Sequence, residues 1–149
     1  MEIRTLFVAI HVMANLVWIG SIASVGWLVA AAAKSNDKSS AVLARGLYLR
    51  VAMPAFLVSF LAGLIRVVLD PAYYMHLHWF HGKLTFALAV IAIHHVIGAR
   101  SRKLVLASTQ ENPSGSMQVG KSGGILAGAL LAFAFLTVVF VIFKQTLVP

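Results

Sequence analysis

Five of the six histidines lie within one short stretch of the sequence, together with a lysine. These residues are His76, His78, His81, Lys83, His94 and His95. The segment around them is otherwise apolar enough to cross a membrane, where an ionisable side chain costs about 2.5–3.5 kcal/mol on insertion scales. Such groups persist where they pair, line a cavity or bind a ligand. Imidazole binds iron, copper, zinc and nickel, so we expect metal or cofactor chemistry in this stretch.

The sixth histidine lies in the first apolar stretch, where His11, Asn15 and Trp18 recur at helical spacing and share one face. A polar pair in an apolar helix should face the interior of a bundle, where its hydrogen bonds can be satisfied. Two interpretations remain open. Either His11 is a cofactor ligand with Asn15 and Trp18 beside it, or His11 is hydrogen-bonded to a neighbouring helix with Asn15 as an interhelical contact.

Helical geometry divides the histidine-rich stretch into two faces. One face carries Lys83, Val90 and His94, with His76 if the helix extends back that far, and the other carries His81, Thr85, Leu88, Ala92 and His95. His81 and His95 are separated by about 21 Å of helical rise, a spacing seen where two b-type haems are stacked through a bundle. Because His11 is the only histidine elsewhere, a second haem at His95 would need methionine, water or another protomer.

The composition places these residues in an integral membrane protein. The 149 residues are 60% hydrophobic and their mean hydropathy is +0.92, which excludes a soluble globular domain. Apolar stretches long enough to span a bilayer lie at about residues 5–33, 41–69, 79–100 and 122–144. We therefore expect a single all-α domain over residues 1–149, a four-helix transmembrane bundle. Asp70 and Pro71 predict a short interfacial helix over residues 71–77.

The basic residues predict the orientation in the membrane. Eight lie in or beside the first-to-second and third-to-fourth connections, and four lie on the opposite side. The positive-inside rule then places the first set in the cytoplasm and both termini on the periplasmic side of a cell inner membrane. Since the net charge of +8 comes from these helix-end positions, we expect no nucleic-acid partner.

Three further features concern the helices and the connection between the last two of them. Pro54 predicts a kink in the second span. Small residues at four-residue spacing form ridges on two spans, Ala55, Ser59 and Gly63 on the second and Gly120, Gly124 and Gly128 on the fourth. Such ridges allow close helix contacts, and we expect a homodimer or higher homo-oligomer through them. The connection over residues 101–121 is polar and predicts a flexible loop without a site.

Haem b near the outer leaflet is the cofactor that these residues favour. A large, flat, apolar ring held by histidine ligation to iron suits the core of a helix bundle. Its propionates need cations near the surface, and Arg66, Lys83 and His76 are the candidates. Copper is the competing interpretation, because Met75, His76, His78 and His81 form a short cluster near the outer surface.

The sequence also resembles a known family. The stretch H-G-K-L-T-F-A-L-A-V-I-A-I-H-H-V-I-G from His81 resembles the H-x-K…H-H segment of the HemJ family, the membrane protoporphyrinogen IX oxidases. His11 and the W-I-G from Trp18 are similar to that family's H…W-x-x-G, and L-Y-L-R-V-A-M-P-A from Leu47 resembles its L-Y-x-x-I-M-x-P-A. The matches cover the first three spans. Two further family motifs, a Y-L-P-R-L-F-V-Y-H-like tract and an R-x-x-N-E-x-P-like motif, are replaced here.

The resemblance implies a b-haem, oligomerisation, and oxidation of protoporphyrinogen IX to protoporphyrin IX with electrons passed to the respiratory chain. The family's functionally important histidine and lysine fall on His11 and Lys83. Two alternatives remain: a haem-binding electron-transfer or carrier protein without that activity, and a copper-handling protein like the related CopD-like membrane proteins.

For the site itself we expect His11 and one residue of the third span to ligate the haem iron. His81 is the choice by position, with His94 and His95 as alternatives. Lys83 is expected to bind a propionate or a substrate carboxylate, because an ammonium group must lose its proton before it can ligate iron. Lys83 and His76 are the expected catalytic residues that hold the tetrapyrrole substrate.

Overall fold

The protein is a bundle of long helices in the computed structural model, which describes residues 3–110, 113–120 and 122–143. The elements in order are α1 (Ile3–Ser35), α2 (Lys38–Leu47), a π-helical turn η1 (Tyr48–Ala52), α3 (Met53–Leu69), α4 (Pro71–Met75), α5 (His78–Thr109), α6 (Pro113–Gly120) and α7 (Gly123–Ile142). Four stretches of the described chain are long and apolar enough to cross a membrane: Thr5–Ser35, Lys38–Leu69, His78–Thr109 and Met117–Ile142. The predicted all-α bundle of four spans is confirmed. Lys121 and Lys144, which the charge count used, and the side chain of Arg4 lie outside the described residues.

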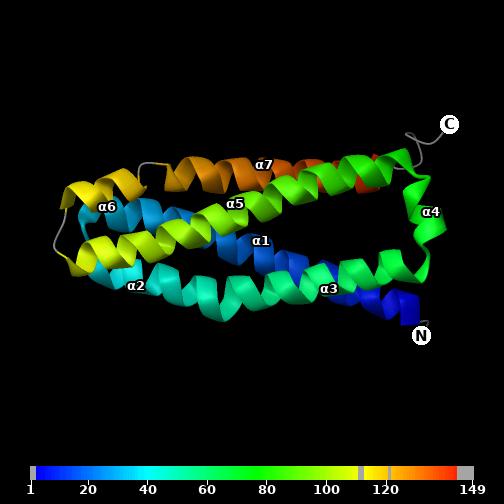
Figure 1. The fold of residues 1–149 in the computed structure, drawn as a ribbon, viewed down its shortest axis with the longest axis horizontal. Coiled ribbons are helices and arrows are strands. Elements are labelled where there is room, and N and C mark those ends of the chain that lie inside the picture. Colours follow the sequence, from blue (N-terminus) through cyan, green and yellow to red (C-terminus); the bar gives the residue numbers. More distant parts are fainter. Residues whose placement is uncertain (1–2, 111–112, 121, 144–149) are drawn as a thin grey trace.

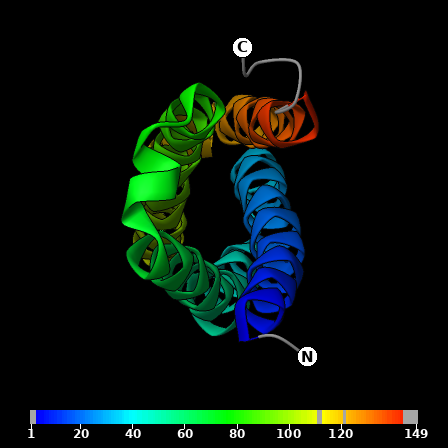
Figure 2. The ribbon, with the colours of Figure 1, turned by 90° about the vertical axis from the view of Figure 1, so that its right-hand side faces the viewer.

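The helices form two pairs that separate toward one end of the molecule. α1 packs most extensively on α3, and α5 on α7. Figure 1 shows the elements close together at the end that carries α2 and α6, while the two pairs diverge toward α4. Figure 2 shows the same divergence from the α4 end, with α1 crossing obliquely from α7 to α3. The start of α1 and the end of α7 both lie at the α4 end, as an even number of spans requires.

The third span is longer than the sequence predicted. α5 ends at Thr109 rather than near residue 100. Ser101 and Leu104 are buried in this extension, and Arg100 ties it to the start of the last span by donating to the Val119 carbonyl and to Ser122 Oγ. The connection over residues 101–121 was predicted as a flexible loop, but its described part is largely helical. The reason is that this segment packs against the neighbouring helices.

The second span changes from an α-helix to a π-helical turn just before Pro54. Met53 N–H donates to the Tyr48 carbonyl, which closes a π-helical turn just before the proline. Proline lacks an N–H donor and crowds the preceding turn, so a wider turn at this point accommodates it. Next to the position of the predicted kink the structure has the π-turn η1, which also places Tyr48 in the bundle core.

Glycines allow α1 and α7 to approach closely. A Cβ added to Gly123 would lie 2.8 Å from the Gly26 carbonyl oxygen and 3.1 Å from Ala30 N. Gly120 similarly packs against Ala33, whereas a Cβ on Gly128 would meet no atom within 4 Å. Of the predicted ridge on the fourth span, Gly120 is therefore used for close packing within the chain, while the close approach to the α1 backbone is made by Gly123, which is not a member of that ridge.

This crossing gives a first prediction. We expect Gly123→Ala to destabilise the protein by about 1–3 kcal/mol, because the added methyl meets backbone atoms that cannot rotate away. Gly20→Ala in α1 is the control, because a Cβ on Gly20 would meet no atom within 4 Å, and its effect should be neutral or stabilising by up to about 1 kcal/mol, the helix-propensity gain. Thermal unfolding in detergent, followed by circular dichroism, measures both. Equal melting temperatures for the two variants would contradict the crossing.

Candidate functional site

His11 is held between α1 and α3 by a small polar network. Its Nδ1–H donates to the Ser59 carbonyl at 2.8 Å, and the Asn15 amide donates to His11 Nε2 at 3.0 Å. Ser59 Oγ in turn donates to Asn15 Oδ1 at 2.8 Å. The interhelical hydrogen bonds expected for this face are therefore present. They also fix the tautomer, with the proton on Nδ1 and the lone pair on Nε2.

The orientation of His11 is the one that metal-ligating histidines adopt. Such histidines donate their second ring N–H to a carbonyl or carboxylate, which directs the other nitrogen at the metal. The flat ring also has a matching space, because a Cβ on Gly63 would lie 3.0 Å from His11 Cε1 and 3.1 Å from Nδ1. Ser59 and Gly63, which the sequence suggested as a packing ridge, are the residues that receive the His11 ring.

Two cationic side chains lie near His11, toward the α4 end. Arg66 from α3 and Lys83 from α5 are both half-buried. Both charges act electrostatically on His11, and the Arg66 charge also acts on Lys83. Arg66 Nη2 donates to Tyr74 Oη at 2.6 Å, and its guanidinium stacks on the Tyr74 ring at 5.9 Å. Arg66 and Tyr74 also line a surface hollow together with Leu69, Asp70 and Tyr73.

Lys83 is the unusual member of this group. Within the described residues its ammonium has no hydrogen bond and no ion-pair partner, although it is half-buried in an apolar span beside another cation. A charge in that position is costly unless a counter-ion binds to it. The arrangement of Arg66 and Lys83 therefore favours an anionic ligand at the α4 end.

A second polar centre lies farther inside the bundle, at His94 of α5. Trp18 Nε1–H donates to His94 Nδ1 at 3.0 Å, and the imidazole is 0% exposed. The rings of Phe56 and Tyr48 lie 5.0 Å and 5.1 Å from it, centre to centre. Trp18 shares a helix face with His11, but its indole contacts His94 instead of completing the His11 network.

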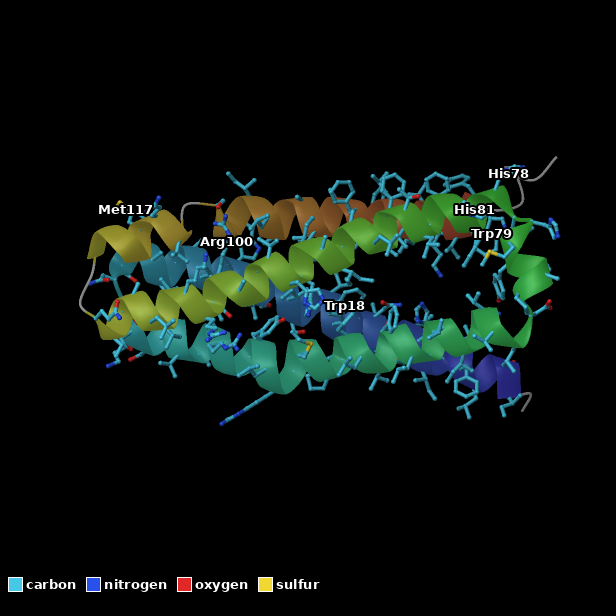
Figure 3. The ribbon with its side chains drawn as sticks, in the orientation of Figure 1. Trp18, His78, Trp79, His81, Arg100 and Met117 are labelled. Atoms are coloured by element: carbon cyan, nitrogen blue, oxygen red, sulfur yellow. The ribbon has the colours of Figure 1, made fainter. Side chains whose placement is uncertain are left out.

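The remaining histidines of the predicted site are exposed. His81 Nε2–H donates to the Met75 carbonyl at 2.9 Å, and among the described residues no hydrogen bond or ring contact joins it to His11. His76 caps the end of α4 and His78 begins α5. His95 touches the rings of Phe56 and His94 edge-on. In Figure 3 His78 and His81 lie at the α4 end of α5, and Trp18 lies near the middle of the bundle.

The described residues contain no group of three or more His, Cys, Asp or Glu side chains that could hold a metal ion. The copper interpretation, which depends on His76, His78 and His81 converging, gains no support from this part of the chain. A haem iron needs only one or two protein ligands and is unaffected by that result.

Comparisons with protein-family models, with curated proteins and with solved structures found no match to this chain. Its function must therefore be argued from its own residues. They form an oriented imidazole flanked by two cations at the α4 end, and a fully enclosed imidazole held by an indole in the core.

Proposed function

We propose that this protein is a haem b-binding membrane oxidoreductase that acts on a tetrapyrrole at the α4 end of the bundle, as the HemJ-like motifs of its first three spans imply. The observation that carries the proposal is the orientation of His11, whose Nδ1–H is held by the Ser59 carbonyl beside Arg66 and Lys83. This combination offers one iron ligand and two carboxylate-binding groups at one end of a membrane bundle.

The proposed setting is a cell inner membrane, with the α4 end on the periplasmic side. The described basic residues support this orientation, since seven lie toward the α2 and α6 end and two toward the α4 end. The seven are Lys34, Lys38, Arg45, Arg50, Arg100, Arg102 and Lys103, and the two are Arg66 and Lys83. By the positive-inside rule the richer end faces the cytoplasm. We also propose a homodimer or higher homo-oligomer, for which Gly128 offers an open small-residue surface.

The residues fit a haem iron at His11 with one local change. His11 would ligate through Nε2, which requires the Asn15 amide to turn away from that nitrogen. His81 is proposed as the second ligand on the sequence pattern alone. It lies on the exposed face of α5, opposite Lys83, so its ring would have to turn toward the bundle to ligate the iron. His94 is less suitable, because its Nδ1 accepts the Trp18 N–H and its Nε2 must then carry the proton that a ligand nitrogen gives up.

The other residues bind and orient the substrate. Arg66 is fixed by Tyr74 and presents its remaining N–H groups to a carboxylate, and Lys83 supplies the second cation. His76, exposed at the end of α4, lies at the same end of the bundle and is proposed to contact a further carboxylate. A bound haem supplies the one-electron relay between the substrate and the respiratory chain.

The visible absorption spectrum of the detergent-purified protein tests this proposal directly. We expect a Soret band and, after dithionite reduction, a sharp α band with near-stoichiometric haem b by pyridine haemochrome. The protein must be expressed with ample haem supply. A colourless protein under those conditions would contradict haem binding.

The space beside His11 gives a second prediction. Gly63→Ala should lower haem occupancy, because the new methyl group pushes the His11 ring away from the Ser59 carbonyl. Loss of one such positioning contact weakens metal binding by about 10–100-fold. Gly20→Ala is the control, since a Cβ on Gly20 would meet no atom within 4 Å. Haem per protein, measured at limiting haem, should fall in the first variant and not in the second.

A further inference from the structure

The core of the bundle contains a hydrogen-bond donor that the proposed function does not use. His94 is fully buried, and its Nδ1 accepts the indole N–H of Trp18. A neutral imidazole with an accepting Nδ1 carries its proton on Nε2. Within the described residues, His94 Nε2 is the buried side-chain nitrogen or oxygen atom that lacks a hydrogen-bond partner. An unpaired buried donor costs stability, so its presence requires an explanation.

Two common partners do not suit this position. A metal ion needs a lone pair on Nε2, and the Trp18 hydrogen bond keeps the proton there. A buried water needs two to four polar partners. The imidazole is instead in contact with the rings of Trp18, Phe56, Tyr48 and His95, and within the described residues its hydrogen bond is to Trp18 alone. The missing partner is therefore an acceptor that tolerates an aromatic, largely apolar surrounding.

We propose that His94 Nε2–H donates to a carbonyl oxygen of a membrane-soluble quinone. The site lies about halfway along α5, so its ligand must be soluble in the hydrocarbon region, whereas the ester carbonyls of phospholipids lie near the headgroups. The rings of Phe56 and Tyr48 lie at 31° and 32° to the imidazole plane. Aromatic walls of this kind favour a flat ring, and a quinone combines a flat ring with carbonyl acceptors.

In this proposal the quinone head group reaches His94 past Phe56. The Phe56 ring is nearly buried beside the imidazole and lies 5.8 Å from the ring of Phe60, which is 46% exposed. Because His94 is fully enclosed, the head group reaches the in-plane Nε2–H by displacing the Phe56 side chain, and its tail then lies along Phe60 in the lipid. The π-turn η1 supplies Tyr48, whose ring also packs against the imidazole, and π-turns inside helices frequently occur at functional sites.

Tryptophan fluorescence provides the test, because Trp18 is bonded to the imidazole in question. Replacing Trp27 and Trp79 by phenylalanine leaves Trp18 as the single reporter. The measurements use the full-length protein in detergent and in the His11→Ala background, so that haem absorption does not interfere. We expect saturable quenching by decylubiquinone. This quinone site is independent of the proposed function, so the quenching of Trp18 fluorescence tests it whether or not haem binds at His11.

The decisive comparison is between His94→Gln and His94→Met, which have nearly the same shape. Only glutamine keeps an N–H donor. We expect His94→Met to weaken the apparent affinity for decylubiquinone about tenfold and His94→Gln to stay within about threefold of the parent. His95→Met, the same change at the exposed neighbour, should have no effect. Equal quenching in His94→Met and the parent, equal loss in both His94 variants, or equal loss in His95→Met would overturn the proposal.

Discussion

His11→Ala should give a folded protein that is purified without haem. The substitution removes the one histidine outside the histidine-rich stretch of residues 76–95, together with its bonds to Ser59 and Asn15. The lost hydrogen bond to Ser59 should cost only about 0.5–1.5 kcal/mol of stability, so the helices should remain assembled. Haem per protein, from the pyridine haemochrome of the purified variant, should fall at least about tenfold.

Two controls separate ligation from packing. His78→Ala changes an exposed histidine at the start of α5 and should keep the parent's haem content. Asn15→Ala removes the amide that occupies His11 Nε2 and should keep or raise haem affinity, since the ligand nitrogen is then free. Unchanged haem in His11→Ala, with intact helicity by circular dichroism, would make the His11 network a packing feature.

Lys83→Ala should keep haem and lose tetrapyrrole turnover. Lys83 is half-buried, is near Arg66, and has no hydrogen-bond or ion-pair partner within the described residues, so its ammonium is available to a substrate carboxylate. A charge-assisted hydrogen bond of about 1.5–3 kcal/mol corresponds to a loss of about 10–100-fold in kcat/KM. Fluorescence of the protoporphyrin formed from protoporphyrinogen measures the rate, and rescue of a strain that lacks protoporphyrinogen oxidase provides the cellular readout.

The outcomes of this experiment separate the remaining functions. Lys103→Ala, an exposed lysine toward the other end of α5, is the control and should keep both haem and activity. Loss of haem and turnover together in Lys83→Ala would indicate a structural or ligand role for the lysine. A parent protein that contains haem but neither turns over the substrate nor rescues the strain would be an electron-transfer or carrier protein.

Helix periodicity separated the two faces of the third span, but it did not indicate which face lies in the bundle. The face of the third span that carries Val90 and His94 is the face buried in the bundle, and Lys83 on the same face is half-buried. Thr85, Leu88 and the other members of the opposite face are exposed. A side chain's position around its own helix depends only on residue spacing, so it is readable from sequence. His76 departed from this pattern because α4 ends before α5 begins.

The sequence by itself determined that this protein has four segments long and apolar enough to cross a membrane, because length and hydropathy are properties of each segment taken alone. Only the tertiary structure decided which polar groups meet. His11 and Trp18 share a face of α1, yet His11 bonds Ser59, 48 residues away, and Trp18 bonds His94, 76 residues away. These pairings depend on how the helices tilt and cross, and on the π-turn before Pro54 and the glycines that set the crossings. Such features belong to pairs of helices, and no single segment contains them.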